Sequence, residues 1–140
     1  MKTISLFQPW ASAMALGLKS IETRGTRIHH RGLCAIHAAK KWTEDEQEYC
    51  EDFARQFAKP ALLDPPRGCI IAVGRIVDCR PTEEIVEELR YTESLLGNYA
   101  TGRFGWLFED IRALETPIPY RGQQGQWDTP DALFPEEFLR

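Results

Sequence analysis

The sequence predicts a single small α+β domain, built as a barrel-like sheet with two or three short helices around it. Three observations lead to this prediction. The chain has 140 residues, which fits one domain. Apolar runs of strand length occur along the whole chain, and the helical patterns do not alternate with them as they would in a doubly wound parallel sheet. No repeat, low-complexity tract or linker divides residues 1–140.

The expected strands are short and of mixed spacing. The run Cys69-Ile70-Ile71-Ala72-Val73 is too short and too rich in β-branched residues for a free helix, and it reads as a buried strand. Alternation from Phe104 onwards places Trp106 and Phe108 on one face, where we expect core. The strands are predicted at residues 4–7, 18–24, 33–39, 69–78 and 104–114.

The expected helices carry recognisable start and stop signals. A helix at residues 11–16 follows Pro9, which suits a first helical turn, and it ends at Gly17. Thr43 and Glu46 have the spacing of a capping box and begin a helix that continues to about residue 58. A short acidic helix is predicted at residues 82–89. Residues 97–102 and 122–127 are predicted to be loops, and residues 134–138 to close with a turn of helix.

Composition excludes several classes of protein. Hydrophobic residues make up 43% and charged residues 27% of the chain, and no apolar stretch approaches the length of about 18 residues that a membrane span needs. The N-terminus lacks the long apolar run of a secretory signal, so we expect a cytoplasmic protein without membrane contact. The four cysteines and three histidines show no metal-ligand spacing. We therefore expect reduced thiols, no metal and no cofactor.

Charge is distributed unevenly along the chain. The formal net charge of −4 argues against a protein that binds nucleic acid with its whole surface. Residues 1–41, however, carry seven basic side chains against one acidic one, a net charge of +6, while residues 42–140 carry ten against twenty, a net charge of −10. This asymmetry permits a basic face on an acidic body.

The most informative stretch is residues 17–24, which combines a glycine turn with Lys19, Glu22 and Arg24. Strand alternation places Glu22 and Arg24 on one face, and Lys19 joins them only if the backbone departs from a regular strand near Gly17. Lys19 and Glu22 fit a general acid–base pair, or a binding pair in which a cation contacts phosphate and Glu22 accepts from a base amino group. A structural alternative is that Glu22 and Arg24 pair with neighbours and stabilise the strand.

Residues 5–24 resemble the ASCH domains, relatives of the PUA fold. Ser5 to Ala11 match the opening stretch of that family, and Gly17, Lys19, Glu22 and Arg24 match its Gly-x-Lys-x-x-Glu-x-Arg signature. The likeness continues through residues 36–40, 69–78 and 117–127, and so spans nearly the whole chain. The resemblance implies a PUA-like small β-barrel with short peripheral helices and a cleft beside the signature. Such small domains also occur in phages and prophages.

The resemblance implies a function in two classes. Members of the family are regarded as RNA- or nucleic-acid-binding modules, and some small bacterial members look like ribonucleases or amidohydrolases that act on N4-acetylcytidine. The amidohydrolases have a lysine in the Gly-x-Lys position and a threonine nucleophile three residues later. Lys19 fits that pattern, but Glu22 occupies the threonine position, and Thr23 would point the other way on a strand.

Three functional hypotheses follow. The first is a domain that binds RNA, a nucleotide or a modified nucleoside in a cleft at the signature. The second is a hydrolase with Lys19 and Glu22 as catalytic residues. The third is a protein-interaction module in which acidic helices at residues 44–58 and 82–89 meet a basic partner. The expected ligand-binding residues are Gln8, Trp10, Lys19, Glu22, Arg24, Arg27, Lys40 and Trp127.

Several of these side chains also have structural interpretations. Trp10 and Trp127 either stack on a base or fill the barrel. Arg27 lies in a basic loop that either contacts the nucleic-acid backbone or is solvated, and Lys40 either extends the basic face or is solvated. His37, inside an apolar strand, fits a hydrogen-bonded core histidine better than a catalytic one.

Overall fold

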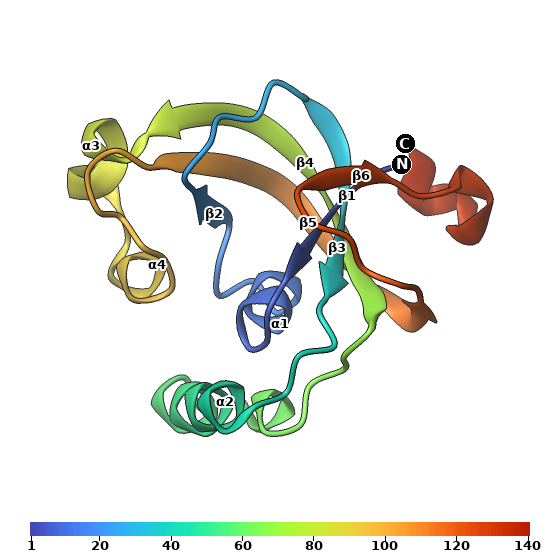
Figure 1. The fold of residues 1–140 in the computed structure, drawn as a ribbon, viewed down its shortest axis with the longest axis horizontal. Coiled ribbons are helices and arrows are strands. Elements are labelled where there is room, and N and C mark those ends of the chain that lie inside the picture. Colours follow the sequence, from blue (N-terminus) through green and yellow to red (C-terminus); the bar gives the residue numbers. More distant parts are fainter.

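The computed structural model describes residues 1–140 and contains one six-stranded sheet that curls into a half-barrel (Figure 1). The strand order is β2-β5-β4-β3-β1-β6. β1 and β3 pair in parallel, and all other neighbours are antiparallel. The strands are β1 (Lys2–Leu6), β2 (Ile21–Arg24), β3 (Gly32–Ala38), β4 (Cys69–Pro81), β5 (Phe104–Pro119) and β6 (Gln126–Asp128).

Short helices surround this sheet, and α1 lies in its hollow (Figure 1). The α-helices are α1 (Trp10–Ala15), α2 (Glu44–Gln56), α3 (Thr82–Ile85) and α4 (Tyr91–Leu95). α1 ends at Gly17, whose φ of +78° is readily adopted only by glycine. The amides of Gly17 and Leu18 donate to the carbonyls of Met14 and Ala13, which is the Schellman pattern of helix termination. The helix stop predicted at Gly17 is therefore present.

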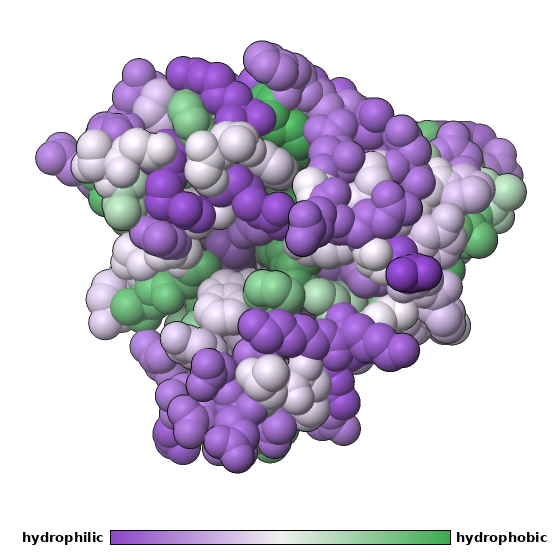
Figure 2. All heavy atoms as spheres, viewed as in Figure 1, coloured by the Kyte–Doolittle hydropathy of each residue, from purple (hydrophilic) through white to green (hydrophobic).

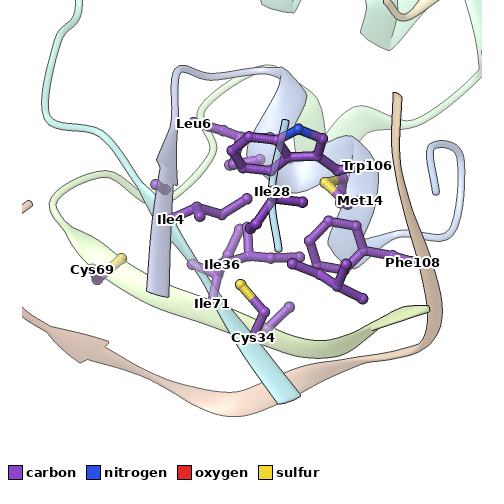
Figure 3. Packing of buried hydrophobic residues seen from close by; sticks show 14 of the residues in the cluster. Ile4, Leu6, Met14, Ile28, Cys34, Ile36, Cys69, Ile71, Trp106 and Phe108 are labelled. Carbon is purple, nitrogen blue, oxygen red and sulfur yellow. The ribbon is translucent and has the colours of Figure 1, made fainter. Parts of the chain in front are cut away.

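The main hydrophobic core fills the concave side of the sheet. Side chains from β1, α1, β3, β4 and β5 point toward one another there, as Figure 3 shows for Ile4, Met14, Ile36 and Ile71. Trp106 and Phe108 are each 4% exposed and belong to this cluster, which confirms the core position expected from their alternation on the strand. The core attaches α1 to the sheet, so the residues that follow α1 are carried to the rim of the half-barrel.

Two smaller clusters complete the packing. In one of them, Phe134 and Phe138 from the C-terminal 3-10 turns pack against Val73 and Leu114 of the sheet. In the other, Ala13 of α1 packs with Phe53 of α2 and with buried leucines of the adjoining segments. This second cluster positions α2 opposite the rim of the sheet, where it forms one side of a cleft.

The observed elements match the predicted fold class, and several boundaries differ. Residues 18–20 are irregular, so β2 begins at Ile21 and not at residue 18. β4 and β5 extend beyond their predicted ends at residues 78 and 114, to Pro81 and Pro119. The polar second half of β5 lacks an apolar alternation, and its pairing with β4 keeps it extended. α4 and β6 were not predicted, because neither has a sufficient apolar period. None of the helices combines the length and the apolar composition that crossing a membrane requires.

Candidate functional site

A cleft of about 1460 Å³ opens between the rim of the sheet and α2. Figure 2 shows it as a recess with hydrophobic surface at its bottom and hydrophilic side chains along its edge. Its floor comes from the C-terminal ends of β1 and β3 and from β2. Its sides come from α2, from residues 95–98 at the end of α4 and just after it, and from the loop at residues 120–125. Segments far apart in the sequence therefore meet around one space.

The cleft is strongly basic although the whole chain is acidic. One acidic side chain, Glu22, lines it, against five basic ones, while the formal net charge of the chain is −4. Among the basic residues, Lys40 and Arg121 are exposed and make no ion pair or side-chain hydrogen bond within the protein. These two cations are free to contact an anion. The basic lining residues are Arg24, Lys40, Arg67, Arg103 and Arg121.

One side of the cleft is aromatic. Phe7 and Tyr49 are 50% and 48% exposed, which is unusual for rings of this size. Trp10 packs against the main core, and its ring centroid lies 5.0 Å from that of Tyr49 and 5.9 Å from that of Phe53. The ammonium nitrogen of Lys41 also lies 4.8 Å from the ring centroid of Phe7. The result is a surface on which a planar ligand can stack.

Glu22 and Arg24 form an ordered pair on the floor. Arg24 donates from Nε to Glu22 Oε2 at 2.8 Å and from Nη2 to the carbonyl of Ser5 at 2.8 Å. Its guanidinium lies 5.4 Å from the ring centroid of Trp106. The second carboxylate oxygen, Oε1, accepts no hydrogen bond within the protein and has Lys19 Nζ at 3.8 Å. The pair stabilises β2 at the rim, as the structural alternative expected, and also faces the cleft.

Lys19 lies behind this pair and does not line the cleft. It is 1% exposed, and its ammonium donates to the carbonyls of Ile21 and Leu96, the latter at 2.9 Å. Burial lowers the pKa of Lys19, and the nearby carboxylates of Glu22 and Glu93 only partly offset that effect. The backbone does depart from a regular strand before Ile21, which is the condition under which Lys19 was expected to join Glu22.

Glu93 holds the irregular segment in place. It is 2% exposed, and its carboxylate accepts from the backbone amides of Ser20 and Ile21 at 2.9 and 3.1 Å. These bonds satisfy two donors that no strand partner reaches, and they link α4 to the start of β2. Glu93 was missed in the sequence because one glutamate in an acidic segment carries no signal of burial.

His37, on β3, lines another part of the cleft floor. Its Nε2 lies 2.7 Å from the carbonyl of Tyr120 and its Nδ1 lies 3.0 Å from Ser5 Oγ. A neutral ring donating from Nε2 and accepting at Nδ1 satisfies both partners. Burial lowers the pKa of His37 despite the opposing effect of the bond to Tyr120. Gly122 packs so closely that a Cβ there would lie 2.7 Å from the imidazole Cε1. The imidazole is thus a hydrogen-bonded core group that also lines the cleft.

The structure brings together only part of the predicted site. Trp10, Glu22, Arg24 and Lys40 line the cleft. Gln8, like Lys19, is outside its lining: Gln8 is fully buried and donates to Ser12 Oγ and to the carbonyl of Pro66.

Arg27 and Trp127 also lie outside the cleft lining. Arg27 is exposed and places its guanidinium 4.6 Å from the ring centroid of Phe104. Trp127 is 6% exposed and stacks on Tyr120 at 5.7 Å, so it supports a cleft residue from behind. The basic loop after Gly25 therefore does not face the cleft.

The cleft lining includes residues of α2 and of the segments 67–68, 95–98 and 120–125 that were not predicted, together with unpredicted side chains of the strands. Their only sequence signal is glycine, at Gly97 and at Gly122 and Gly125, which marks loops without indicating that they meet. No group of three histidine, cysteine, aspartate or glutamate side chains is placed to hold a metal ion. The missed residues with polar side chains are Ser5, Thr23, His37, Tyr49, Arg67, Asn98, Arg103, Tyr120, Arg121, Gln123 and Gln124.

The curled sheet, with α1 in its hollow and a cleft at its rim, defines a PUA-like α+β domain. The model of the ASCH domain matches residues 4–129. The chain belongs to the ASCH domain family, as its resemblance at residues 5–24 implied.

Relatives and solved structures agree with this assignment. Activating signal cointegrator 1 from Homo sapiens is 24% identical over 128 residues, covering 89% of this chain and 21% of that protein. The Mus musculus protein of the same name is 23% identical with the same coverage. The chain thus spans about a fifth of the length of these relatives. The crystal structure of ASCH from Zymomonas mobilis superposes with a TM-score of 0.60 at 16% identity, covering 99% of this chain and 92% of that one.

Proposed function

We propose that this ASCH domain binds single-stranded RNA, with one nucleotide seated in the cleft. The observation that carries the proposal is the composition of the cleft. Five basic side chains and one acidic one surround it, in a chain whose net charge is −4, and aromatic rings form one side. Cations that track phosphates, combined with rings on which bases stack, are the two features that single-strand binding requires.

The parts of the cleft suggest a division of roles. Lys40 and Arg121 have no partner within the protein and are the best placed to neutralise phosphates. Tyr49 and Phe7 present half-exposed rings for stacking. Glu22 is the one lining group that accepts without donating, and it suits the polar edge of a base. A duplex does not fit this scheme, because its bases are already stacked on one another.

The test is a titration of single-stranded RNA at several salt concentrations, with Lys40→Ala and Arg121→Ala as variants. Each is expected to weaken binding by about fivefold at low salt and to reduce the slope of log K against log salt by about 0.7, because each removes one phosphate contact. Arg55→Ala is the matched control: Arg55 lies on α2, is 76% exposed, pairs with Asp52 and is not in the cleft.

The control should bind as the unmodified protein does. If the control and the two cleft variants weaken binding equally, attraction to the general surface explains it and the cleft assignment is wrong. Absence of RNA binding at low salt would overturn the proposed function and would leave the protein-interaction hypothesis, which a salt-dependent pull-down without retained nucleic acid would then support.

Hydrolysis of the bound nucleotide is a second candidate. Glu22 faces the cleft with Lys19 Nζ 3.8 Å behind it, and the pKa of Lys19 is lowered by burial, as a general base requires. The two hydrogen bonds that Lys19 donates to backbone carbonyls would have to break before Lys19 could reach a ligand. RNA cleavage or nucleoside deacylation that disappears in Glu22→Gln and Lys19→Ala would favour this candidate, whereas recovery of intact ligand would favour binding alone.

A further inference from the structure

We propose that the nucleotide seated in the cleft is selected for guanine, through the carboxylate of Glu22. This inference rests on the proposed function and goes beyond it by naming the base. It depends on three observations: the free acceptor of Glu22, the engagement of Arg24, and the groups that hold both in place.

Glu22 is the only acidic side chain of the cleft, and it is only partly engaged by the protein. Oε2 accepts from Arg24, while Oε1 accepts no hydrogen bond within the protein and lies 3.8 Å from Lys19 Nζ, beyond hydrogen-bond distance. A carboxylate offers about four acceptor sites, so most of them remain open. A ligand that meets Glu22 must bring N–H or O–H donors.

Guanine is the base whose pairing edge supplies them best. It carries two adjacent donors, N1–H and the N2 amino group, which match the two oxygens of a carboxylate. Uracil has one ring N–H between two carbonyl oxygens, so a carboxylate facing it meets repulsion on both sides. Adenine and cytosine each present an amino group beside a ring nitrogen that is itself an acceptor. A site built from acceptors rejects such edges because one of its buried groups is left without a donor.

Arg24 does not reverse this preference. Cytosine would bind well if one donor group met its ring nitrogen N3 and another met its carbonyl oxygen O2. Two nitrogens of Arg24 already donate within the protein, Nε to Glu22 and Nη2 to the carbonyl of Ser5. Three N–H groups of Arg24 remain and supply a donor for the O6 carbonyl of guanine beside the two guanine donors that Glu22 accepts, so the pair matches the whole pairing edge of guanine; the CMP titration tests the alternative of cytosine.

The acceptor is also rigidly placed. Lys19 supports the carboxylate from behind with its own stem fully buried, and Trp106 lies beside the guanidinium of Arg24. Glu93 anchors the backbone that leads into β2. A site whose polar groups are held before the ligand arrives discriminates between similar ligands more strongly than a flexible one.

The experiment compares five nucleoside monophosphates, GMP, IMP, AMP, CMP and UMP, by titration calorimetry at one salt concentration. All five carry the same phosphate, so differences report the base. GMP is expected to bind about tenfold more tightly than AMP, CMP or UMP. IMP, which keeps the N1–H of GMP and lacks its amino group, is expected to lie between them. This comparison needs no variant and is independent of any effect on folding.

Two variants separate base selection from phosphate binding. Glu22→Gln keeps the shape but replaces one acceptor by a donor, so it should abolish the preference for GMP while its affinity for UMP stays within about twofold. Arg121→Ala should weaken all five nucleotides by a similar factor and leave their ratios unchanged. Circular dichroism verifies that both variants are folded.

The outcomes distinguish this inference from the proposed function. Binding of all five nucleotides with equal affinity, or tightest binding of CMP or AMP, would overturn guanine selection and leave RNA binding in place. An unchanged GMP preference in folded Glu22→Gln would show that another group reads the base and would also overturn the inference. Failure of every nucleotide and of single-stranded RNA to bind would overturn both.

Discussion

Lys19 illustrates how a single side chain can shape a cleft that it does not line. Its ammonium is 1% exposed and satisfies the carbonyls of Ile21 and Leu96, which belong to β2 and to the segment after α4. A buried ammonium is costly unless it is paired and hydrogen-bonded. Here the carboxylates of Glu22 and Glu93 provide the opposite charge. Lys19 thus joins two segments of the rim and positions Glu22.

Replacing Lys19 by alanine should therefore destabilise the protein. We expect Lys19→Ala to lower the free energy of unfolding by about 3 kcal/mol, because two buried carbonyls lose their donor and Glu22 loses a neighbouring cation. Urea unfolding followed by tryptophan fluorescence measures the change. Lys59→Ala is the control, since Lys59 is exposed and unpaired, and it should stay within about 0.5 kcal/mol of the unmodified protein.

A loss for Lys19→Ala as small as that of the control would contradict the structural role. Because Lys19 positions Glu22, reduced RNA binding in a variant that is still folded would agree with this role and would not require direct contact between Lys19 and the ligand.

His37 gives the protein a pH dependence of definite sign. Burial lowers the pKa of His37 in the folded state below its ordinary value of 6.5. The unfolded chain therefore takes up a proton first as the pH falls, so stability that is fully present above 6.5 decreases through the window below it, down to the folded-state pKa. The decrease reaches at most about 1.4 kcal/mol per pH unit.

The variant His37→Gln should remove this contribution while keeping a donor for Tyr120. The free energy of unfolding, measured with urea, is expected to fall more between about pH 7.5 and about pH 5.5 in the unmodified protein than in His37→Gln. Equal drops in both proteins would mean that other groups, and not His37, cause the acid sensitivity.

At the scale of elements, the cleft depends on α2 standing opposite the sheet. α2 contributes Tyr49 and Phe53 to the aromatic side, and its apolar stripe packs on α1 through Phe53 and Ala54. The helix begins at the capping box of Thr43 and Glu46. The Glu46 carboxylate accepts from the Thr43 hydroxyl at 2.8 Å and from its backbone amide at 3.4 Å. These bonds close the first turn of α2 directly after the irregular segment that follows β3 and contains Lys40.

Removing the cap tests this element. Thr43→Ala should lower the free energy of unfolding by about 1 kcal/mol, the usual cost of losing an N-cap side chain. Thermal unfolding followed by circular dichroism measures it, with Thr101→Ala as the control because Thr101 is exposed in a loop and makes no side-chain hydrogen bond. A Thr43→Ala variant as stable as the control would mean that α2 is held by its packing alone.

At the scale of the whole molecule, folding rearranges the charge pattern of the chain. The basic residues 1–41 contribute Arg24 and Lys40 to the cleft, but Arg67, Arg103 and Arg121 come from the acidic remainder. The basic cleft is therefore not simply the basic third of the chain. Arg27 and Arg31 belong to that third and lie on an exposed loop outside the cleft. The salt dependence of RNA binding should accordingly follow the cleft residues and not the local charge of the sequence.

Local patterns determined much of this protein. The end of α1 at Gly17, the start of α2 at Thr43, and the core positions of Trp106 and Phe108 depend on residues a few positions apart, and all were predicted. The ordered signature at residues 17–24 identified the family. Such features can be predicted because backbone conformation and burial period are set by near neighbours.

Only the tertiary structure decided which of the predicted residues meet and which are buried. Glu93 bonds to Ile21 across 72 positions, and His37 bonds to Tyr120 across 83, and neither partner signals the other in the sequence. Lys19 and Gln8 look like surface residues in the sequence, yet carbonyl groups brought in from distant segments make their burial favourable. Desolvation of a polar group depends on the whole arrangement around it, and that arrangement forms only when the sheet has curled and closed over α1.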